Sequence, residues 1–438
     1  MKSTRQMKIN LKNPFLLYSP VLLLNLAIVI RLRQYALGGD GPRYLGFAQR
    51  LLHGHYSPAG TIDLWNGPGY PIVLMPLVLV GAPPLAVTLL NAIFQYLSSI
   101  LLFLSLKKVV PLRLAAAGGF IWGFYFVAYD QMAHVATETL TGLLVTLVLY
   151  GLVLTFPGNR RRAKYYCGLS LGFLILVKVM FAYVILVLAI IYLGIALVRK
   201  FLPPYRKILA ILGIAFLTTL PYLIYTYQLT GKLFYWSNSG GMSLYWMSTP
   251  FPHEYGDWEP NDLTSLLHPP AHQNPFRENI DTQLNDEAIR GLIANHDSDY
   301  QAIYQFTGVE RDEAFKKKAI ANIKRYPGKF LLNCVSNAGR LLFNTPYTWK
   351  YEEPGMLVRV VFNSVLFTFI LLATCITIYQ WGRVEGWLRF GLCFLAIYLF
   401  ASIAVSAYSR MFYVIVPMFI FWILYVLHRM MRISFPKS

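Results

Sequence analysis

Residues 165–198 read YYCGLSLGFLILVKVMFAYVILVLAIIYLGIALV, and this stretch decides the class of fold. It holds 34 residues and a single charged side chain, Lys178, near its middle. One helix needs about 20 apolar residues to cross a bilayer, so the stretch is too long for one ordinary crossing. It therefore predicts a hairpin of two short membrane helices with Lys178 at the turn.

Comparable apolar runs recur along the whole chain of 438 residues, of which 56% are hydrophobic and 13% charged. Soluble proteins have about 25% charged residues, so this composition strongly disfavours a soluble fold, and it excludes a disordered protein. Beside the hairpin, eight runs are candidate spans: 14–31, 85–106, 114–129, 134–155, 206–226, 356–380, 387–407 and 411–428. We predict an all-α polytopic membrane protein with about ten transmembrane helices.

The distribution of basic residues supports this count. Lys plus Arg number 39 and Asp plus Glu 20, which gives a formal net charge of +19. With the N-terminus in the cytoplasm, every short basic cluster falls on the cytoplasmic side, as the positive-inside rule requires. The pattern predicts a multi-pass protein of the plasma (inner) membrane with both termini cytoplasmic; an endoplasmic reticulum location is the alternative. It also explains the basic excess without a nucleic-acid partner.

Three parts of the chain differ in composition. The segment 228–355 holds 15 of the 20 acids and 12 of the 39 bases, a net charge of −3, whereas the other 310 residues carry +22. We predict an N-terminal transmembrane catalytic module at 1–227, with about seven crossings. We expect 228–355 to form a small, mostly helical exterior (periplasmic) domain, and 356–438 to form a C-terminal transmembrane module of three helices.

Local patterns add detail to the exterior parts. The first exterior loop, 32–84, should carry short interfacial helices, and its apolar piece 70–81 is too short to span a bilayer. Within the exterior domain, 310–326 has helical spacing, 328–345 is amphipathic and suits the membrane surface, and 247–280 is typical of irregular loop.

Five acids remain outside the exterior domain: Asp40, Asp63, Asp130, Glu138 and Glu385. All but Glu385 fall on the outer side of the membrane in this topology. Ionisable side chains kept at one face of a membrane protein are candidates for a functional site. The alternative for Asp40 and Asp63 is that they are solvated loop residues.

Several motifs occur in a fixed order along the chain. Asp40 lies in Gly38-Gly39-Asp40-Gly41-Pro42-Arg43-Tyr44, and the same loop ends in Asn66-Gly67-Pro68-Gly69-Tyr70-Pro71. Thr137-Glu138-Thr139-Leu140, Lys178 and Ser409-Arg410 follow. Together they resemble the GT-C superfamily glycosyltransferases, in the bacterial protein-mannosyltransferase-like branch that includes aminoarabinose transferases. The chain departs from the family pattern in having Lys rather than Arg at 178, and it lacks a second acid beside Asp40.

The resemblance implies an activity. Such an enzyme moves a sugar from a polyprenyl-phosphate-linked donor to a lipid, glycan or protein acceptor at the outer face of the membrane. Asp40 would be the general base that takes the proton of the acceptor hydroxyl. Lys178 and Arg410 would stabilise the phosphate leaving group. The alternative for both cations is that they extend to lipid headgroups.

Asp130, His134 and Glu138 are spaced i, i+4 and i+8, which places them on one face if they share a helix. With Asp40 they could hold a divalent cation. The alternative is that they bind the sugar or orient Asp40. Tyr44, Tyr70 and Trp65 are candidate sugar contacts, although most aromatic rings in such a protein belong to the interfacial belt.

Two other functions fit part of the pattern. A lipid-linked sugar transporter or flippase should show paired broken helices and ionisable residues at the bilayer midplane. A surface-polysaccharide polymerase or ligase would be expected to use Arg-rich exterior loops instead of an early Asp.

Overall fold

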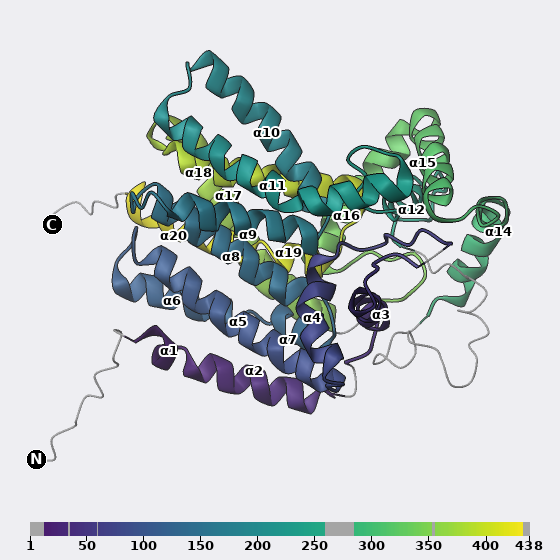
Figure 1. Ribbon diagram of the computed structural model, residues 1–438, viewed down its shortest axis with the longest axis horizontal. Coiled ribbons are helices and arrows are strands. Elements are labelled where there is room, and N and C mark those ends of the chain that lie inside the picture. Colours follow the sequence, from purple (N-terminus) through teal and green to yellow (C-terminus); the bar gives the residue numbers. More distant parts are fainter. Residues whose placement is uncertain (1–12, 34–35, 59, 259–283, 353–354, 432–438) are drawn as a thin grey trace, which may run out of the picture.

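The computed structural model describes residues 13–33, 36–58, 60–258, 284–352 and 355–431 (Figure 1). These residues form helices and no strands; a single isolated bridge joins Leu284 to Lys350. The predicted all-α polytopic fold is therefore confirmed.

Ten apolar helices or helix pairs occupy the ten predicted spans. Six have the length and hydropathy of a membrane crossing: α5 (Pro84–Leu106), α8 (Glu138–Thr155), α10 (Met180–Val198), α11 (Pro203–Thr230), α17 (Gly355–Tyr379) and α18 (Gly386–Val405). A seventh candidate is the pair α6 (Leu112–Gly123) and α7 (Val127–Ala133), bent by 51°. Three shorter apolar helices complete the set: α2 (Ser19–Arg31), α9 (Ala163–Val177) and α20 (Val416–Arg429).

The long apolar stretch forms the predicted hairpin. Helix α9 ends at Val177, and Lys178 has an extended backbone with φ −137° and ψ 96°. Helix α10 then begins at Met180. Helix α9 packs between α8 and α11, so the turn at Lys178 lies at the end of a tightly packed group of helices.

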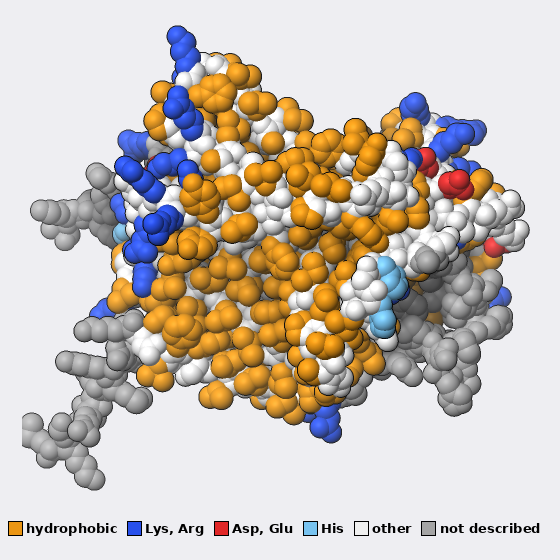
Figure 2. Space-filling view, viewed as in Figure 1, with side chains coloured by type: hydrophobic (Ala, Val, Ile, Leu, Met, Phe, Trp, Pro, Cys, Tyr) orange, Lys and Arg blue, Asp and Glu red, His pale blue; other side chains and the backbone are white. Residues whose placement is uncertain are grey.

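The membrane helices form one bundle. Figure 1 shows α5, α6, α8, α9 and α11 running side by side, and Figure 2 shows that they present a broad hydrophobic surface. Arg429 Nε donates to Val109 O at 2.9 Å, and Gln380 Nε2 donates to Met430 O at 2.9 Å, so the basic turns and the end of α20 meet at one end. In Figure 2, Lys and Arg side chains gather at this end of the hydrophobic surface, on the left.

Buried polar side chains fix how the helices pack. Tyr413 Oη donates to Gln95 Oε1 at 2.6 Å, and Gln95 Nε2 donates to Trp122 O at 2.8 Å. Trp122 Nε1 in turn donates to Ser98 Oγ at 2.8 Å. An unpaired polar group in an apolar interior costs several kcal/mol, so these bonds fix the register of α5 and α6 against the chain around Tyr413.

The segment 228–355, which was predicted to be exterior, contains α12 (Gly240–Met247), α14 (Asp286–Ile303), α15 (Gly308–Arg325) and α16 (Pro327–Phe343). The helix predicted at 310–326 is α15, and the amphipathic stretch 328–345 is α16. The irregular loop predicted at 247–280 is irregular over 248–258; its remainder from 259 lies outside the described residues.

Two short helices lie in the loop at 32–84, where short helices were predicted. They are α3 (Gly41–Leu52) and α4 (Gly69–Leu79), and the 11 residues of α4 are too few to cross a bilayer.

Several predicted spans are interrupted near their ends. The span 14–31 is split into α1 (Pro14–Leu17) and α2, and 411–428 into α19 (Ser409–Tyr413) and α20. The span 114–129 bends between α6 and α7. The span 134–155 was predicted too long at its start, because α8 begins at Glu138. Two of these breaks place residues of the candidate site.

Candidate functional site

Five charged side chains from four parts of the fold form a continuous row, which we call the charged row: Arg43, Asp40, Arg410, Glu138 and Lys178. Arg43 Nη1 lies 3.3 Å from Asp40 Oδ1, and Arg410 Nη1 lies 3.4 Å from Asp40 Oδ2. Arg410 Nε is 3.8 Å from Glu138 Oε1, and Lys178 Nζ is 3.1 Å from the same oxygen. Three cations thus alternate with two carboxylates, and the row carries one net positive charge.

Asp40 occupies the turn that starts α3. Gly39 before it has φ +61°, a conformation that favours glycine, and Pro42 stands in the first turn of the helix. The chain therefore reverses sharply and places the Asp40 carboxylate at the start of α3. Both of its oxygens face a guanidinium group.

Glu138 and Lys178 form the buried part of the row. Their side chains are 3% and 14% exposed, respectively. Removing two charges from water is costly unless they pair, and the 3.1 Å contact between them supplies that pairing. The break between α9 and α10 places Lys178 where it can reach the first residue of α8.

Arg410 joins the two halves of the row. It lies on the short helix α19, and its side chain is 38% exposed. Its contacts of 3.4 Å and 3.8 Å are longer than the 2.7–2.9 Å of tight charge-assisted hydrogen bonds. The guanidinium, which also lies over the Tyr408 ring at 5.3 Å from its centroid, therefore has no tight ion-pair partner among the described residues.

The glycines of Asn66-Gly67-Pro68-Gly69 explain how the loop at 32–84 reaches Lys178. A Cβ atom on Gly67 would lie 2.1 Å from Leu176 O, and one on Gly69 would lie 2.6 Å from Val177 N. Only residues without a side chain fit at such a distance. The loop that begins with Asp40 is thereby packed directly against the last turn of α9.

Asp130, His134 and Glu138 do not share a helix face, which corrects the prediction made from their spacing. Helix α7 ends at Ala133, His134 is extended with φ −112° and ψ 153°, and α8 begins at Glu138. Hydrogen bonds from residues distant in sequence stabilise this non-helical backbone. Asn91 Nδ2 donates to His134 O at 2.8 Å, and Val135 N donates to Ala36 O at 2.9 Å.

The four candidate metal ligands consequently do not gather at one point. Asp130 Oδ1 lies 3.7 Å from His134 Nε2, whereas Asp40 contacts two arginines and Glu138 contacts Lys178. Among the described residues, no three His, Cys, Asp or Glu side chains gather as a metal site. Carboxylates already neutralised by Lys and Arg do not fit a divalent cation, so we derive no step through a metal.

The three candidate sugar-contacting rings lie near the Asp40 end of the row. Arg43 stacks over the Trp65 ring, 5.0 Å from its centroid. Tyr44 accepts a hydrogen bond from Asn66 Nδ2 at 3.2 Å, and burial raises the pKa of its hydroxyl. Tyr70 is fully buried and packs edge-on against Tyr44 at 5.1 Å between centroids, so it supports that ring.

Arg43 is the member of the row that sequence reasoning missed. The signal was present, because Arg43 follows Asp40 by three residues in a loop that was predicted to carry short helices. Residues at i and i+3 are neighbours on a helix, so an ion pair between them could have been expected.

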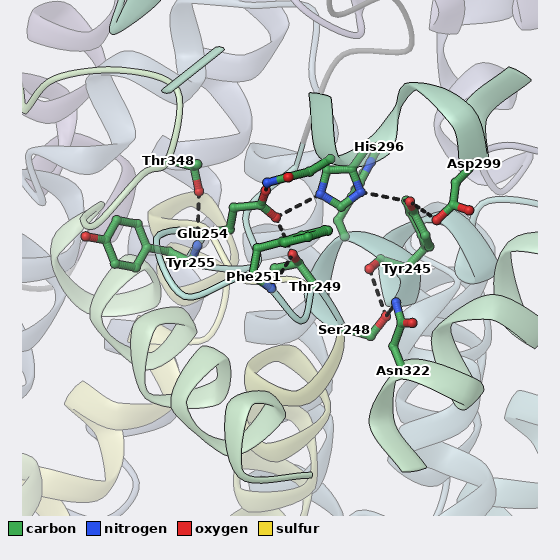
Figure 3. Close-up of polar contacts among 12 residues, drawn as sticks. Tyr245, Ser248, Thr249, Phe251, Glu254, Tyr255, His296, Asp299, Asn322 and Thr348 are labelled. Atoms are coloured by element: carbon green, nitrogen blue, oxygen red, sulfur yellow. Dashed lines mark hydrogen bonds and ion pairs between the residues drawn. The ribbon is translucent and has the colours of Figure 1, made fainter. Parts of the chain in front are cut away.

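A second polar cluster lies in the segment 228–355 (Figure 3). His296 Nε2 is 2.8 Å from Glu254 Oε2, and its Nδ1 is 2.8 Å from Tyr245 Oη, which also donates to Asp299 Oδ2 at 2.9 Å. His296, Glu254 and Tyr245 are all buried, which keeps a substrate from reaching them. The cluster instead joins α12 and α14 to the loop that carries Glu254.

No protein-family model and no curated protein matches this chain. Similar solved structures include ArnT from Cupriavidus metallidurans bound to undecaprenyl phosphate, with 15% identity and a TM-score of 0.40 over 94% of this chain and 77% of that one. Another is the archaeal oligosaccharyltransferase AglB from Archaeoglobus fulgidus, in complex with an inhibitory peptide and a dolichol-phosphate, with 13% identity and a TM-score of 0.46.

The alignment with AglB covers 94% of this chain and 50% of that one, so the chain spans about half the length of AglB. Both proteins are GT-C fold glycosyltransferases, the class that the sequence motifs resemble. Because both TM-scores are below 0.5, the function of this chain is argued below from its own charged row.

Proposed function

We propose that this protein is a glycosyltransferase that moves a sugar from a polyprenyl-phosphate-linked donor to an acceptor at the outer face of the membrane. The observation that carries the proposal is the charged row. It lies where apolar helices end, and it has one net positive charge. It places the Asp40 carboxylate beside Arg410, which Glu138 joins to Lys178, and these two cations can bind a phosphate. The order of sequence motifs supports the same activity.

The reaction follows from the chemistry of the row. An acceptor hydroxyl oxygen attacks the anomeric carbon of the donor sugar, and the Asp40 carboxylate takes the hydroxyl proton. A new glycosidic bond forms as the bond from the anomeric carbon to the phosphate oxygen breaks. Its electron pair stays on that oxygen, and polyprenyl phosphate leaves. Attack opposite the phosphate inverts the anomeric configuration.

Lys178 and Arg410 have the second role. Negative charge develops on the phosphate as the bond breaks, and positioned cations stabilise that charge. Arg410 is loosely held in the row, so a donor phosphate can compete with Asp40 for its guanidinium. Such competition would leave an Asp40 oxygen free to accept the proton.

We propose that Glu138 is a positioning residue. It contacts both phosphate-binding candidates through the same oxygen, Oε1. In the absence of the donor, this contact keeps Lys178 and Arg410 near each other despite their like charge. Asp130 and His134 form a separate pair and are proposed to face the sugar or the acceptor.

The proposed orientation follows from the charge at the two ends of the bundle. The basic turns and the end of α20 would face the cytoplasm, whereas the charged row and the part at 228–355 would face the exterior. The division into modules at 1–227, 228–355 and 356–438 belongs to this proposal. The first and the last of these modules both contribute to the site, because Asp40 comes from one and Arg410 from the other.

The test is a transfer assay with the purified full chain in lipid nanodiscs. A panel of polyprenyl-phosphate sugars, each radiolabelled in the sugar, is incubated with envelope lipids, glycans and proteins as acceptors. We expect label to appear in an acceptor and unlabelled polyprenyl phosphate to appear in equal amount. In sealed vesicles, movement of labelled donor across the bilayer with no glycosylated product would instead support a flippase.

A further inference from the structure

The break between α18 and α19 determines where Arg410 lies. Helix α18 ends at Val405, and Ser406 after it has an extended backbone with φ −166° and ψ 129°. Helix α19 begins at Ser409, directly before Arg410. The last carbonyl groups of a helix have no partner within it, so a break of this kind needs hydrogen bonds from elsewhere to have one fixed geometry.

Helix α16 supplies such bonds on both sides of the break. Asn337 Nδ2 donates to Ile403 O, in the last turn of α18, at 2.8 Å. Ser409 Oγ, at the start of α19, donates to Asn344 Oδ1 at 3.3 Å. Asn337 and Ser409 are buried, so water does not compete for these bonds. Helix α16 therefore connects the end of one helix to the start of the next.

Asn344 is itself fixed at the end of α16. Its backbone is left-handed, with φ 65° and ψ 31°, a conformation that Asn adopts more readily than most residues with a side chain. Its N–H donates to Arg340 O at 2.9 Å, and Tyr347 Oη donates to its Oδ1 at 2.9 Å. The oxygen that binds Ser409 therefore has a set position.

The pattern of α16 shows that these bonds are specific. Asn333, Asn337 and Arg340 are buried, whereas Leu331 and Leu332 on the same helix are each 64% exposed. This amphipathic helix thus turns its polar side towards the rest of the protein. Buried polar side chains need hydrogen-bond partners, so the contacts of this face fix α16 in one position against its neighbours.

We infer that Asn344 is a positioning residue, which holds Ser409 and thereby fixes the backbone of Arg410 where its guanidinium reaches Asp40 and Glu138. The effect on transfer rests on the proposed function, whereas the position of Arg410 can be measured without transfer. The inference also gives the segment 228–355 a part in the site, because α16 belongs to this segment.

The first experiment measures the reactivity of Arg410 in the full chain in lipid nanodiscs. Phenylglyoxal labels arginine side chains, and mass spectrometry of the peptides gives the rate at Arg410. Ser409→Ala removes the donor, and Asn344→Gly removes the acceptor while glycine keeps the left-handed backbone. In each variant, Arg410 should pair less often with the two carboxylates, and its labelling should become about two- to fivefold faster. Exposed Arg290 on α14 is the internal reference and should be labelled at the wild-type rate.

A double-mutant cycle tests whether the two residues act through one bond. Asn344→Gly/Ser409→Ala should raise the labelling rate no further than either single variant does, because both remove the same contact. Ser336→Ala is the matched control, since its Oγ donates to Leu332 O at 3.3 Å within α16. It should leave the labelling of Arg410 unchanged.

Transfer assays on the same samples distinguish positioning from stability. In Ser409→Ala the KM for the donor should rise by a factor similar to that of the labelling rate. A merely structural role would lower the melting temperature and the amount of active protein, and would leave this KM and the labelling at their wild-type values.

The two proposals can fail separately. Wild-type labelling of Arg410 in both folded single variants would overturn the inference, and so would additive effects in the double variant. If the wild type transfers no sugar while the variants still label faster, the proposed function is wrong and the positioning of Arg410 by Asn344 stands.

Discussion

Arg410 and Asp40 are 370 residues apart in the sequence, and their side chains meet at 3.4 Å. The contact joins the loop at 32–84 to the short helix α19, so the site forms only when both ends of the chain are in place. Because Arg410 also approaches Glu138, one guanidinium connects the proposed base to the buried pair at Lys178.

Loss of Lys178 should affect donor binding and the chemical step together. Lys178→Met removes a cation from the proposed phosphate site, and the transfer rate should fall about 10²–10³-fold with a higher KM for the donor. Lys178→Arg should recover part of the rate, because it keeps the charge. Lys232→Met, at an exposed ion pair with Glu313, is the matched control and should behave as the wild type in a steady-state assay.

Glu138 should be needed for stability because of Lys178. Glu138→Leu leaves a largely buried ammonium without its 3.1 Å partner, and the free energy of unfolding should drop by about 3 kcal/mol. The double variant Glu138→Leu/Lys178→Met removes both charges and should recover most of that loss. Thermal unfolding in detergent measures both. If the double variant is as unstable as the single one, the pairing is not the cause.

Gly67 should tolerate no side chain. In Gly67→Ala, the new Cβ would lie 2.1 Å from Leu176 O, so the loop must move away from α9 at a cost of about 1–3 kcal/mol. Transfer should fall as well, because the Asp40 loop is displaced from Lys178. Gly46→Ala in α3 is the control, since its Cβ meets only Arg50 Nη1 at 4.0 Å. Unchanged melting temperature and rate in Gly67→Ala would contradict this packing.

The buried cluster of Figure 3 should stabilise the exterior part without acting in transfer. His296→Ala leaves Glu254 and Tyr245 without a shared partner, and stability should fall by about 1–3 kcal/mol. Limited proteolysis at 240–325 should become faster, while transfer by the remaining folded protein should be unchanged. His253→Ala is an exposed neighbour and should show neither effect. A loss of transfer with normal stability would show a direct role in the reaction.

Much of the fold could be predicted because membrane helices follow local rules. Hydrophobic length and the alternation of basic clusters located the ten apolar helices or helix pairs and the turn at Lys178. The order of motifs also indicated Asp40, Glu138, Lys178 and Arg410 as site residues. The structure brings these four into one row.

The other features of the site depend on contacts between residues that are far apart in the sequence. The row proposed for Asp130, His134 and Glu138 assumed a continuous helix, yet Asn91 and Ala36 bind the backbone at His134 and Val135 and stabilise a break there. The ion pairs of Asp40 with Arg410 and of Glu138 with Lys178 likewise join residues from different parts of the fold, so no spacing in the sequence reveals them. Residue types alone could name the candidate metal ligands. They could not show that Asp40 and Glu138 are already paired with Arg and Lys.

The proposed base is tested most directly by single-turnover transfer in Asp40→Asn. With labelled donor bound at saturating enzyme, we expect transfer to fall about 10²–10⁴-fold while donor binding, measured on the same sample, is retained. Asp63→Asn, in the same loop and paired with Arg50 at 3.2 Å, should transfer at the wild-type rate. Wild-type transfer by a folded Asp40→Asn protein would contradict the account.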